Sequence, residues 1–170
     1  EDYRYQKWRA QHGEAYWWVS FFRVNLLQGV IMWIVSAPLL AAQYYAEPAS
    51  LGILDAIGVL FWGIGMFFEA VGDWQLMMFK RNPANKGKVM DQGVWRYTRH
   101  PNYFGDAMVW WGFFFIALAT TDGVFTIFAP IIMTFLLMRV SGVAMLERNL
   151  KKTKPQYADY IARTSGFIPM

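Results

Sequence analysis

Long apolar segments alternate with short polar connections along this chain. The apolar segments cover about residues 16–40, 51–79, 101–120 and 124–146. A helix needs about 20 apolar residues to cross a bilayer, and each segment is long enough. We therefore predict an all-α fold, a polytopic membrane helical bundle with four transmembrane helices in a single domain over residues 1–170. The second segment is longer than a bilayer requires, so we expect it to tilt, to bend near Gly63 and Gly65, or to continue into the headgroups.

The placement of Lys and Arg predicts how these helices are oriented. The N-terminal segment, the linker at 80–100 and the C-terminal tail are basic, whereas the connections "LAAQYYAEPAS" and "TTDG" contain neither Lys nor Arg. Basic loops stay on the cytoplasmic side of a membrane, so both ends and the 80–100 linker should face the cytoplasm. In the tail, "KPQYADYIARTSGF" places Tyr157, Tyr160 and Ile161 at helical spacing, which predicts a short amphipathic helix at the membrane surface.

Composition agrees with a membrane protein and excludes several other classes. The chain is 56% hydrophobic and 16% charged, whereas soluble domains average about 25% charged residues. It has no Cys, and its two His residues are too few for a His-rich metal site, so we predict no metal. The pI near 9.4 follows from the basic loops and needs no nucleic acid partner. Because the chain begins without Met or a signal peptide, we expect it to be the C-terminal part of a longer protein.

Ionisable residues inside the apolar segments are functional candidates, because each costs roughly 2.5–3.5 kcal/mol on insertion scales. All of them lie in the predicted cytoplasmic half of their helices: Arg23, Glu69, Asp73, Asp106 and Arg139, with Glu147 at a helix end. Glu69, Asp73 and Lys80 share one helical face. Structural pairing is the alternative, either Asp73 with Lys80 or Arg139 with an acidic residue of the second helix.

The stretch "WRYTRHPNYFG", residues 95–105, is the densest polar cluster. Pro101 suits the first turn of a helix, and the free N–H groups there, beside Arg99 and His100, favour an anion. Asn102 and Tyr103 add hydrogen-bonding groups and a ring. The alternative is an aromatic and basic interfacial anchor, which explains Trp95, Arg96 and Tyr97 well.

A nucleotide cofactor fits this pattern. Lys80, Arg99 and Arg139 would neutralise phosphate charge, and Glu69 and Asp73 would accept hydrogen bonds from ribose hydroxyls or an amide. Trp95 or Tyr103 would stack on a flat ring. No Gly-rich strand–turn–helix fingerprint occurs, so the predicted site is built within a helical bundle and not on a Rossmann fold.

At these residues the chain resembles a known family. "GVWRYTRHPNYFGD" resembles the signature of the steroid 5α-reductase family. "FFEAVGDWQLMMFKRNPANKGKVMDQG", "LERNLKKTKPQYADYIARTSGFIP" and "LLQGVIMWIVSAPL" are similar to a bacterial membrane branch long filed as a domain of unknown function. The resemblance covers essentially the whole chain. The wider superfamily includes sterol reductases and isoprenylcysteine methyltransferases, which use NADPH or S-adenosylmethionine.

The resemblance implies a set of cofactor contacts. Asp73 matches an Asp of the steroid reductases, Glu69 stands at an Asn position, and Glu147 stands at a Tyr position. A His of their last helix is replaced near Val143, which weakens a steroid assignment. The complete candidate cofactor-binding set is Glu69, Asp73, Lys80, Trp95, Arg99, His100, Asn102, Tyr103, Arg139 and Glu147. The family's catalytic Glu and Tyr lie in earlier helices, so we assign no catalytic residue here.

We therefore expect an NADPH-dependent reductase of a carbon–carbon double bond in a lipophilic enone. It would lie in the bacterial inner membrane, surrounded by lipid, with its cofactor site facing the cytoplasm and its substrate entering from the bilayer. The first alternative is a membrane methyltransferase that uses S-adenosylmethionine. Lys80, Arg99 and Arg139 count against it, because a sulfonium cofactor needs no such charge. The second alternative is a membrane scaffold without enzymatic activity.

Overall fold

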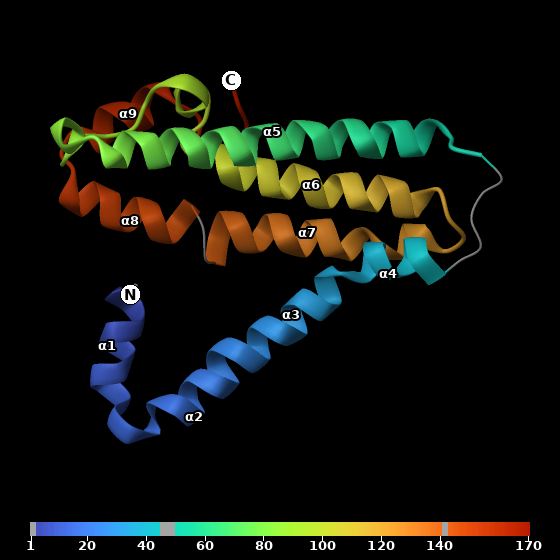
Figure 1. Cartoon of the computed structure of the whole chain (residues 1–170), viewed down its shortest axis with the longest axis horizontal. Helices are drawn as coiled ribbons and strands as arrows, with labels where there is room; N and C mark the ends of the chain where they lie inside the picture. Colours follow the sequence, from blue (N-terminus) through green and yellow to red (C-terminus); the bar gives the residue numbers. More distant parts are fainter. Residues whose placement is uncertain (1–2, 45–49, 141–142) are drawn as a thin grey trace. The chain divides into compact units, whose positions relative to one another are not determined.

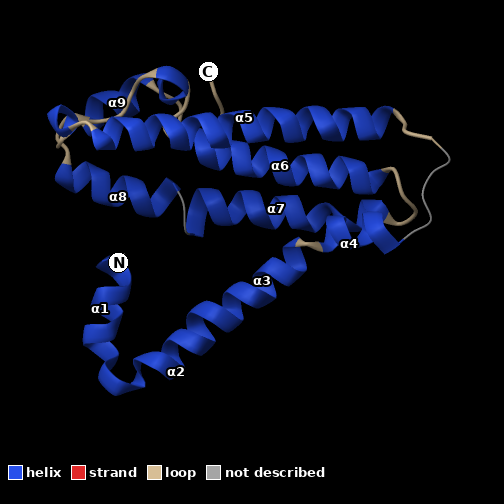
Figure 2. Cartoon of the chain, in the orientation of Figure 1, coloured by secondary structure: helices blue, strands red, loops and turns tan. Residues whose placement is uncertain are grey.

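The computed structural model describes residues 3–44, 50–140 and 143–170 of the chain. Every regular element in these ranges is helical, and the isolated bridge between Thr98 and Ser165 is the one strand-like pairing among them (Figure 2). The predicted all-α class is therefore confirmed. The chain divides into two compact units, Glu1–Ala37 and Pro38–Met170, which are described separately.

The N-terminal unit consists of consecutive helical segments: α1 (Tyr3–His12), η1 (Gly13–Ala15), α2 (Tyr16–Ser20), the π-helical η2 (Phe21–Leu26) and α3 (Leu27–Val35). Together, Tyr5–Val35 form a stretch of 31 residues that is long and apolar enough to cross a membrane. This span begins and ends earlier than the predicted 16–40. It ends at the Ser36 turn, where Ser36 Oγ donates to Trp33 O at 2.8 Å.

After this turn a separate helix, α4 (Ala37–Tyr44), begins. Its second residue is Pro38, which has no backbone N–H and is therefore tolerated only in the first turn of a helix. The predicted first helix is thus divided between α3 and α4.

The second unit carries the remaining elements. They are α5 (Ile53–Arg81), η3 (Pro83–Asn85), η4 (Gly93–Arg96), α6 (Pro101–Leu118), η5 (Gly123–Ile127), α7 (Phe128–Phe135), η6 (Leu136–Val140), α8 (Val143–Thr153) and α9 (Tyr157–Arg163). Within this unit, α6 packs against both α5 and α7, and α9 lies beside the connection between α5 and α6 (Figure 1).

Three of the four predicted helices form in this unit close to their predicted positions. Ile53–Arg81 and Gly123–Val140 are long and apolar enough to cross a membrane. The third predicted helix, 101–120, forms as α6, but it is not among the three segments of the described residues that are long and apolar enough to cross a membrane, so the predicted number of four is not reached. The fourth was predicted to continue to residue 146, but residues 141–142 lie outside the described ranges, and α8 begins after them.

Glycines bring α5 and α6 into direct backbone contact. Gly58, Gly65 and Gly72 recur every seven residues on α5, and Gly105 and Gly112 have the same spacing on α6. A Cβ on Gly65 would lie 2.6 Å from the Gly105 carbonyl oxygen, and a Cβ on Gly105 would lie 2.5 Å from that of Gly65. Gly58 and Gly112 oppose each other likewise, at 2.8 Å in both directions. Small residues at such spacing let membrane helices approach closely over many turns.

This contact changes the interpretation of the glycines in the second helix. A bend near Gly63 and Gly65 was one of three expectations for this helix, beside a tilt and a continuation into the headgroups, but α5 is one uninterrupted helix of 29 residues. Gly65 is buried against α6, whereas an added Cβ on Gly63 would meet nothing within 4 Å. The helix ends at Arg81 because Asn82 precedes Pro83, and a residue before proline is driven out of the helical region.

We predict that Gly65→Ala destabilises the protein and that Gly63→Ala does not. The new methyl group at position 65 must push the backbones of α5 and α6 apart, and overpacking of this kind costs about 1–3 kcal/mol. At position 63 the methyl group enters open space, and alanine favours a helix over glycine by about 1 kcal/mol. The thermal unfolding midpoint in detergent should fall for Gly65→Ala and stay level or rise for Gly63→Ala. Equal midpoints for the two variants would contradict the glycine contact.

Candidate functional site

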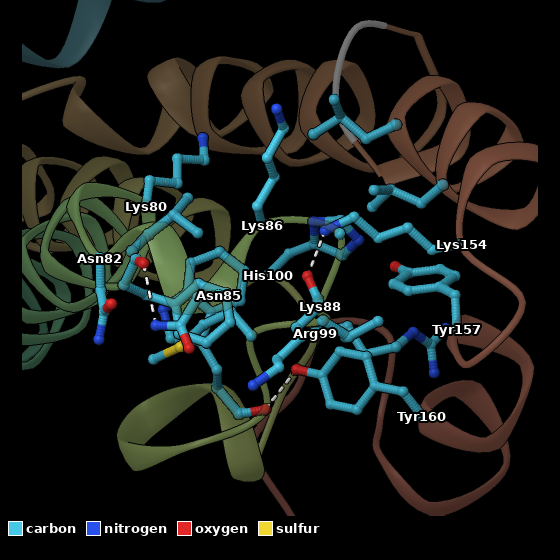
Figure 3. Close-up of a pocket in the computed structure, with 18 of the residues that line it drawn as sticks. Lys80, Asn82, Asn85, Lys86, Lys88, Arg99, His100, Lys154, Tyr157 and Tyr160 are labelled. Atoms are coloured by element: carbon cyan, nitrogen blue, oxygen red, sulfur yellow. Dashed lines mark hydrogen bonds between the residues drawn. The ribbon is translucent and has the colours of Figure 1, made fainter.

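A cavity of about 550 Å³ lies where α5 ends and α6 begins. Its walls come from the last turns of α5, the connection at 82–92, the start of α6, and the segment from α8 to α9 (Figure 3). Six of the ten predicted site residues line it: Lys80, Trp95, Arg99, His100, Asn102 and Tyr103. The other four, Glu69, Asp73, Arg139 and Glu147, do not belong to its lining.

Trp95 forms part of the cavity wall and is buried. Its indole Nε1 donates to the Gly72 carbonyl of α5 at 3.0 Å, and its own carbonyl accepts a hydrogen bond from the Tyr160 hydroxyl. The interfacial-anchor interpretation of Trp95 is therefore wrong, because the indole contacts protein and not lipid. Arg96 and Tyr97 are exposed, as that interpretation requires.

Arg99 ties the start of α6 to the C-terminal helices. Its Nε donates to Glu147 Oε1 at 2.8 Å, and its Nη1 donates to the carbonyls of Ile161, at 3.3 Å, and Thr164. The Glu147 carboxylate neutralises the guanidinium, and the three bonds together satisfy several of its donors from within the protein. Arg99 therefore joins the start of α6 to the C-terminal helices in the cavity wall. Glu147 fixes the guanidinium although it does not itself line the cavity.

His100 is also held by Glu147. Its side chain is nearly completely buried, its Nε2 lies 3.3 Å from Glu147 Oε1, and its ring stacks parallel to that of Tyr103 with centroids 5.6 Å apart. Burial lowers the pKa of His100, although the Glu147 carboxylate acts in the opposite direction. The ring is therefore neutral at pH 7 and presents a flat surface to the cavity.

Asn102 joins α6 to α5 at the edge of the cavity. Its Nδ2 donates to Asp73 Oδ1 at 2.9 Å, and its Oδ1 accepts from the Tyr103 N–H at 3.1 Å. Asp73 thus orients Asn102 although it does not line the cavity. Glu69 lies one turn before Asp73 on α5, close enough to Asp73 and Asp106 for their charges to interact.

Arg139 lies apart from these residues in η6 and is exposed. The predicted structural pairings of Arg139 with an acidic residue of α5, and of Asp73 with Lys80, are absent from the ion pairs that the described residues form.

The connection at 82–92 contributes cavity residues that the sequence analysis missed. Lys86 and Lys88 line the cavity, but we had counted them only as loop charge. Lys154, from the other side, donates through Nζ to the Lys88 carbonyl. Nearby, Arg163 pairs with Asp91 at 2.5 Å, so two contacts join the connection to the C-terminal helices. The pattern "NKGK" followed far away by "KTKPQY" gives no sign of this proximity.

The C-terminal helix α9 forms as predicted, but its apolar face is covered by protein. Tyr157 and Tyr160 are each 2% exposed and both line the cavity. Beyond α9 the tail pairs with the segment that precedes α6: Thr98 Oγ1 donates to Phe167 O at 2.8 Å, and Arg99 N donates to Ser165 O at 2.9 Å. The tyrosine face of this helix therefore packs on protein and not on lipid, while its position at the membrane surface stays a prediction.

The lining of the cavity is strongly cationic. It includes five basic side chains, Lys80, Lys86, Lys88, Arg99 and Lys154, whereas no Asp or Glu lines it in the part of the chain that the structure describes. Aromatic and apolar side chains make up much of the remaining wall. Such a lining suits an anionic ligand that also carries flat or apolar groups. The described residues contain no group of three His, Cys, Asp or Glu able to hold a metal ion.

Comparison with known proteins places this site in a family. The family described as "Protein of unknown function (DUF1295)" matches residues 1–164. A Delta(14)-sterol reductase of Ascobolus immersus is 34% identical over 107 residues, which cover 53% of this chain and 24% of that protein. A probable O-methyltransferase of Ustilaginoidea virens is 40% identical over 48 residues, 28% of this chain and 17% of that protein.

The chain thus spans a quarter or less of the length of these two relatives. No solved structure is similar enough to match. Because the family match runs over nearly the whole chain and agrees with its motifs, the protein belongs to the DUF1295 family, which is steroid 5α-reductase-like.

Proposed function

We propose that this chain is the cofactor-binding part of an integral membrane reductase that uses NADPH to reduce a carbon–carbon double bond in a lipophilic enone. One observation carries the proposal: the cavity at the junction of α5 and α6 is lined by four lysines, the ion-paired Arg99 and aromatic rings, with no carboxylate among its described residues. The similarity to a sterol reductase supports the same reaction class.

The chemistry of the lining fits a phosphorylated dinucleotide. Lys80 and Lys86 supply ammonium groups for phosphate oxygens, and Tyr103 and His100 offer stacked flat rings. Asn102, oriented by Asp73, supplies an amide for ribose or carboxamide groups. When bound, NADPH supplies a hydride, while these residues hold and orient it and keep water out.

The site also fits a membrane enzyme whose soluble cofactor arrives from the cytoplasm. The basic residues cluster at the ends of α5 and α6 that the charge distribution of the loops assigns to the cytoplasm. The lipophilic substrate would enter from the surrounding lipid of a bacterial inner membrane. We propose this orientation and location together with the reaction.

A methyltransferase that uses S-adenosylmethionine is the second candidate. The similarity to a probable O-methyltransferase over 48 residues favours it. The charge of the cavity opposes it, because a sulfonium is itself positive and gains nothing from a lining of ammonium groups. Binding measurements with the two cofactors distinguish the candidates.

We predict that the detergent-solubilised protein binds NADPH and that Lys80→Gln weakens this binding about tenfold, because a charge-assisted contact to phosphate is worth about 1.5–3 kcal/mol. Titration calorimetry measures both affinities. Lys151→Gln is the matched control, since Lys151 is exposed and does not line the cavity. Saturable binding of S-adenosylmethionine without any response to NADPH would refute the reductase proposal.

We also predict that the full-length protein oxidises NADPH when it is supplied with a panel of lipophilic enones, steroidal and non-steroidal. Absorbance at the reduced-nicotinamide band follows the reaction, and mass spectrometry should show a product heavier than its enone by two hydrogens. Asn102→Ala should slow turnover roughly tenfold or more, because it removes a positioned donor. NADPH binding without oxidation by any enone would argue for a binding protein instead.

A further inference from the structure

Two tyrosines of α9 are equally buried, but they differ in the hydrogen bonding of their hydroxyl groups. Tyr157 and Tyr160 are each 2% exposed, both line the cavity, and their ring centroids are 5.8 Å apart. The Tyr160 hydroxyl donates to the Trp95 carbonyl and lies 3.5 Å from that of Thr98. The Tyr157 hydroxyl lies close to the Arg99 guanidinium but meets no described residue in hydrogen-bond geometry.

An unpartnered hydroxyl at this depth needs a physical reason. A buried polar group without a partner destabilises the fold, and phenylalanine would fill the same space without that cost. Burial raises the pKa of Tyr157 to about 12, and the Glu147 carboxylate acts in the same direction, whereas the nearby Arg99 guanidinium opposes them. The hydroxyl is therefore neutral at pH 7 and able to donate a hydrogen bond into the cavity.

Lys154, three residues before Tyr157, carries a partly buried ammonium group that has no carboxylate partner in the described lining. Burial lowers its pKa, and the positive charge of Lys80 lowers it further. The two ammonium groups come from distant parts of the chain, and no carboxylate in the described lining separates them. Figure 3 shows Lys154 and Tyr157 on the same side of the pocket, with the Tyr157 hydroxyl turned toward its interior. An anion with oxygen acceptors would satisfy both residues.

We propose that the Tyr157 hydroxyl and the Lys154 ammonium form a subsite for a phosphate group of the bound ligand. The ammonium, which now donates to the Lys88 carbonyl, would share its donors with a phosphate oxygen, and Tyr157 would donate to a second oxygen. In identifying the ligand as a nucleotide the inference rests on the proposed function, but the subsite itself requires only a phosphate.

The full chain in detergent tests this subsite with inorganic pyrophosphate and, separately, with NADPH. Tyr157→Phe should weaken pyrophosphate binding about tenfold, as expected for the loss of one hydrogen bond to a charged group. Its unfolding midpoint without ligand should not fall, since the lost hydroxyl has no partner in the fold. Lys154→Gln should weaken pyrophosphate binding at least as much.

Tyr160→Phe is the matched control. It removes a hydroxyl that the fold uses, so its unfolding midpoint should fall, while its pyrophosphate affinity, measured well below that midpoint, should remain within about threefold of the parent value. Unchanged pyrophosphate and NADPH affinities in Tyr157→Phe would overturn the inference. A fall in midpoint for Tyr157→Phe equal to that for Tyr160→Phe would also overturn it, because it would reveal a structural partner.

The two ligands separate this inference from the proposed function. Pyrophosphate binding that depends on Tyr157, in a protein that does not bind NADPH, would support the phosphate subsite and refute the reductase proposal. Binding of both NADPH and pyrophosphate that is equally tight in the parent protein and in Tyr157→Phe would support the cofactor proposal and refute the subsite.

Discussion

The backbone contact between α5 and α6 is the constraint on which the rest of the second unit depends. Opposed glycines allow the two helices to touch over most of their length. At the end of this contact, a Cβ on Gly72 would lie 3.2 Å from Pro101 and 3.3 Å from the Asn102 nitrogen, so α6 must begin against α5. That position brings Asn102 to Asp73 and leaves the Gly72 carbonyl to accept from Trp95. The cavity wall is therefore a consequence of helix packing.

The positively charged side chains around the cavity fall into two groups, one bonded within the protein and the other without carboxylate partners in the described lining. Arg99 donates hydrogen bonds to Glu147 and to carbonyls of the C-terminal segment. A planar guanidinium with several fixed N–H groups suits this role. The lysines are flexible point charges without carboxylate partners in the described lining. The first group holds the wall in place, and the second is available to a ligand. The two tyrosines of α9 differ in the same way. The Tyr160 hydroxyl donates to the Trp95 carbonyl, whereas the Tyr157 hydroxyl, at the cavity wall, meets no described residue in hydrogen-bond geometry.

The helices were predictable to within a few residues where hydrophobic length and proline decide their limits. Residues 53–81 and 101–118 were expected as 51–79 and 101–120, because Pro83 and Pro101 mark where the backbone must leave or enter a helix. The sequence did not show whether protein or lipid covers an apolar face. Protein covers Trp95, for which an interfacial anchor was the alternative interpretation, and it covers the tyrosines of α9, whose helix was expected at the membrane surface. Periodicity identifies an apolar face, but lipid and protein satisfy that face equally well, so the pattern alone does not distinguish them.

The sequence by itself determined the membrane class, the helical segments and the polar cluster at 95–105, because these follow from local composition and from the cost of placing charges in lipid. Only the tertiary structure decided which of those charges meet. Lys154 donates to a residue 66 positions away, and Arg99 reaches Thr164 across 65 positions. No local pattern encodes such pairs, since they arise when the tail folds against the start of α6. The same folding places the Glu147 carboxylate against Arg99 and His100.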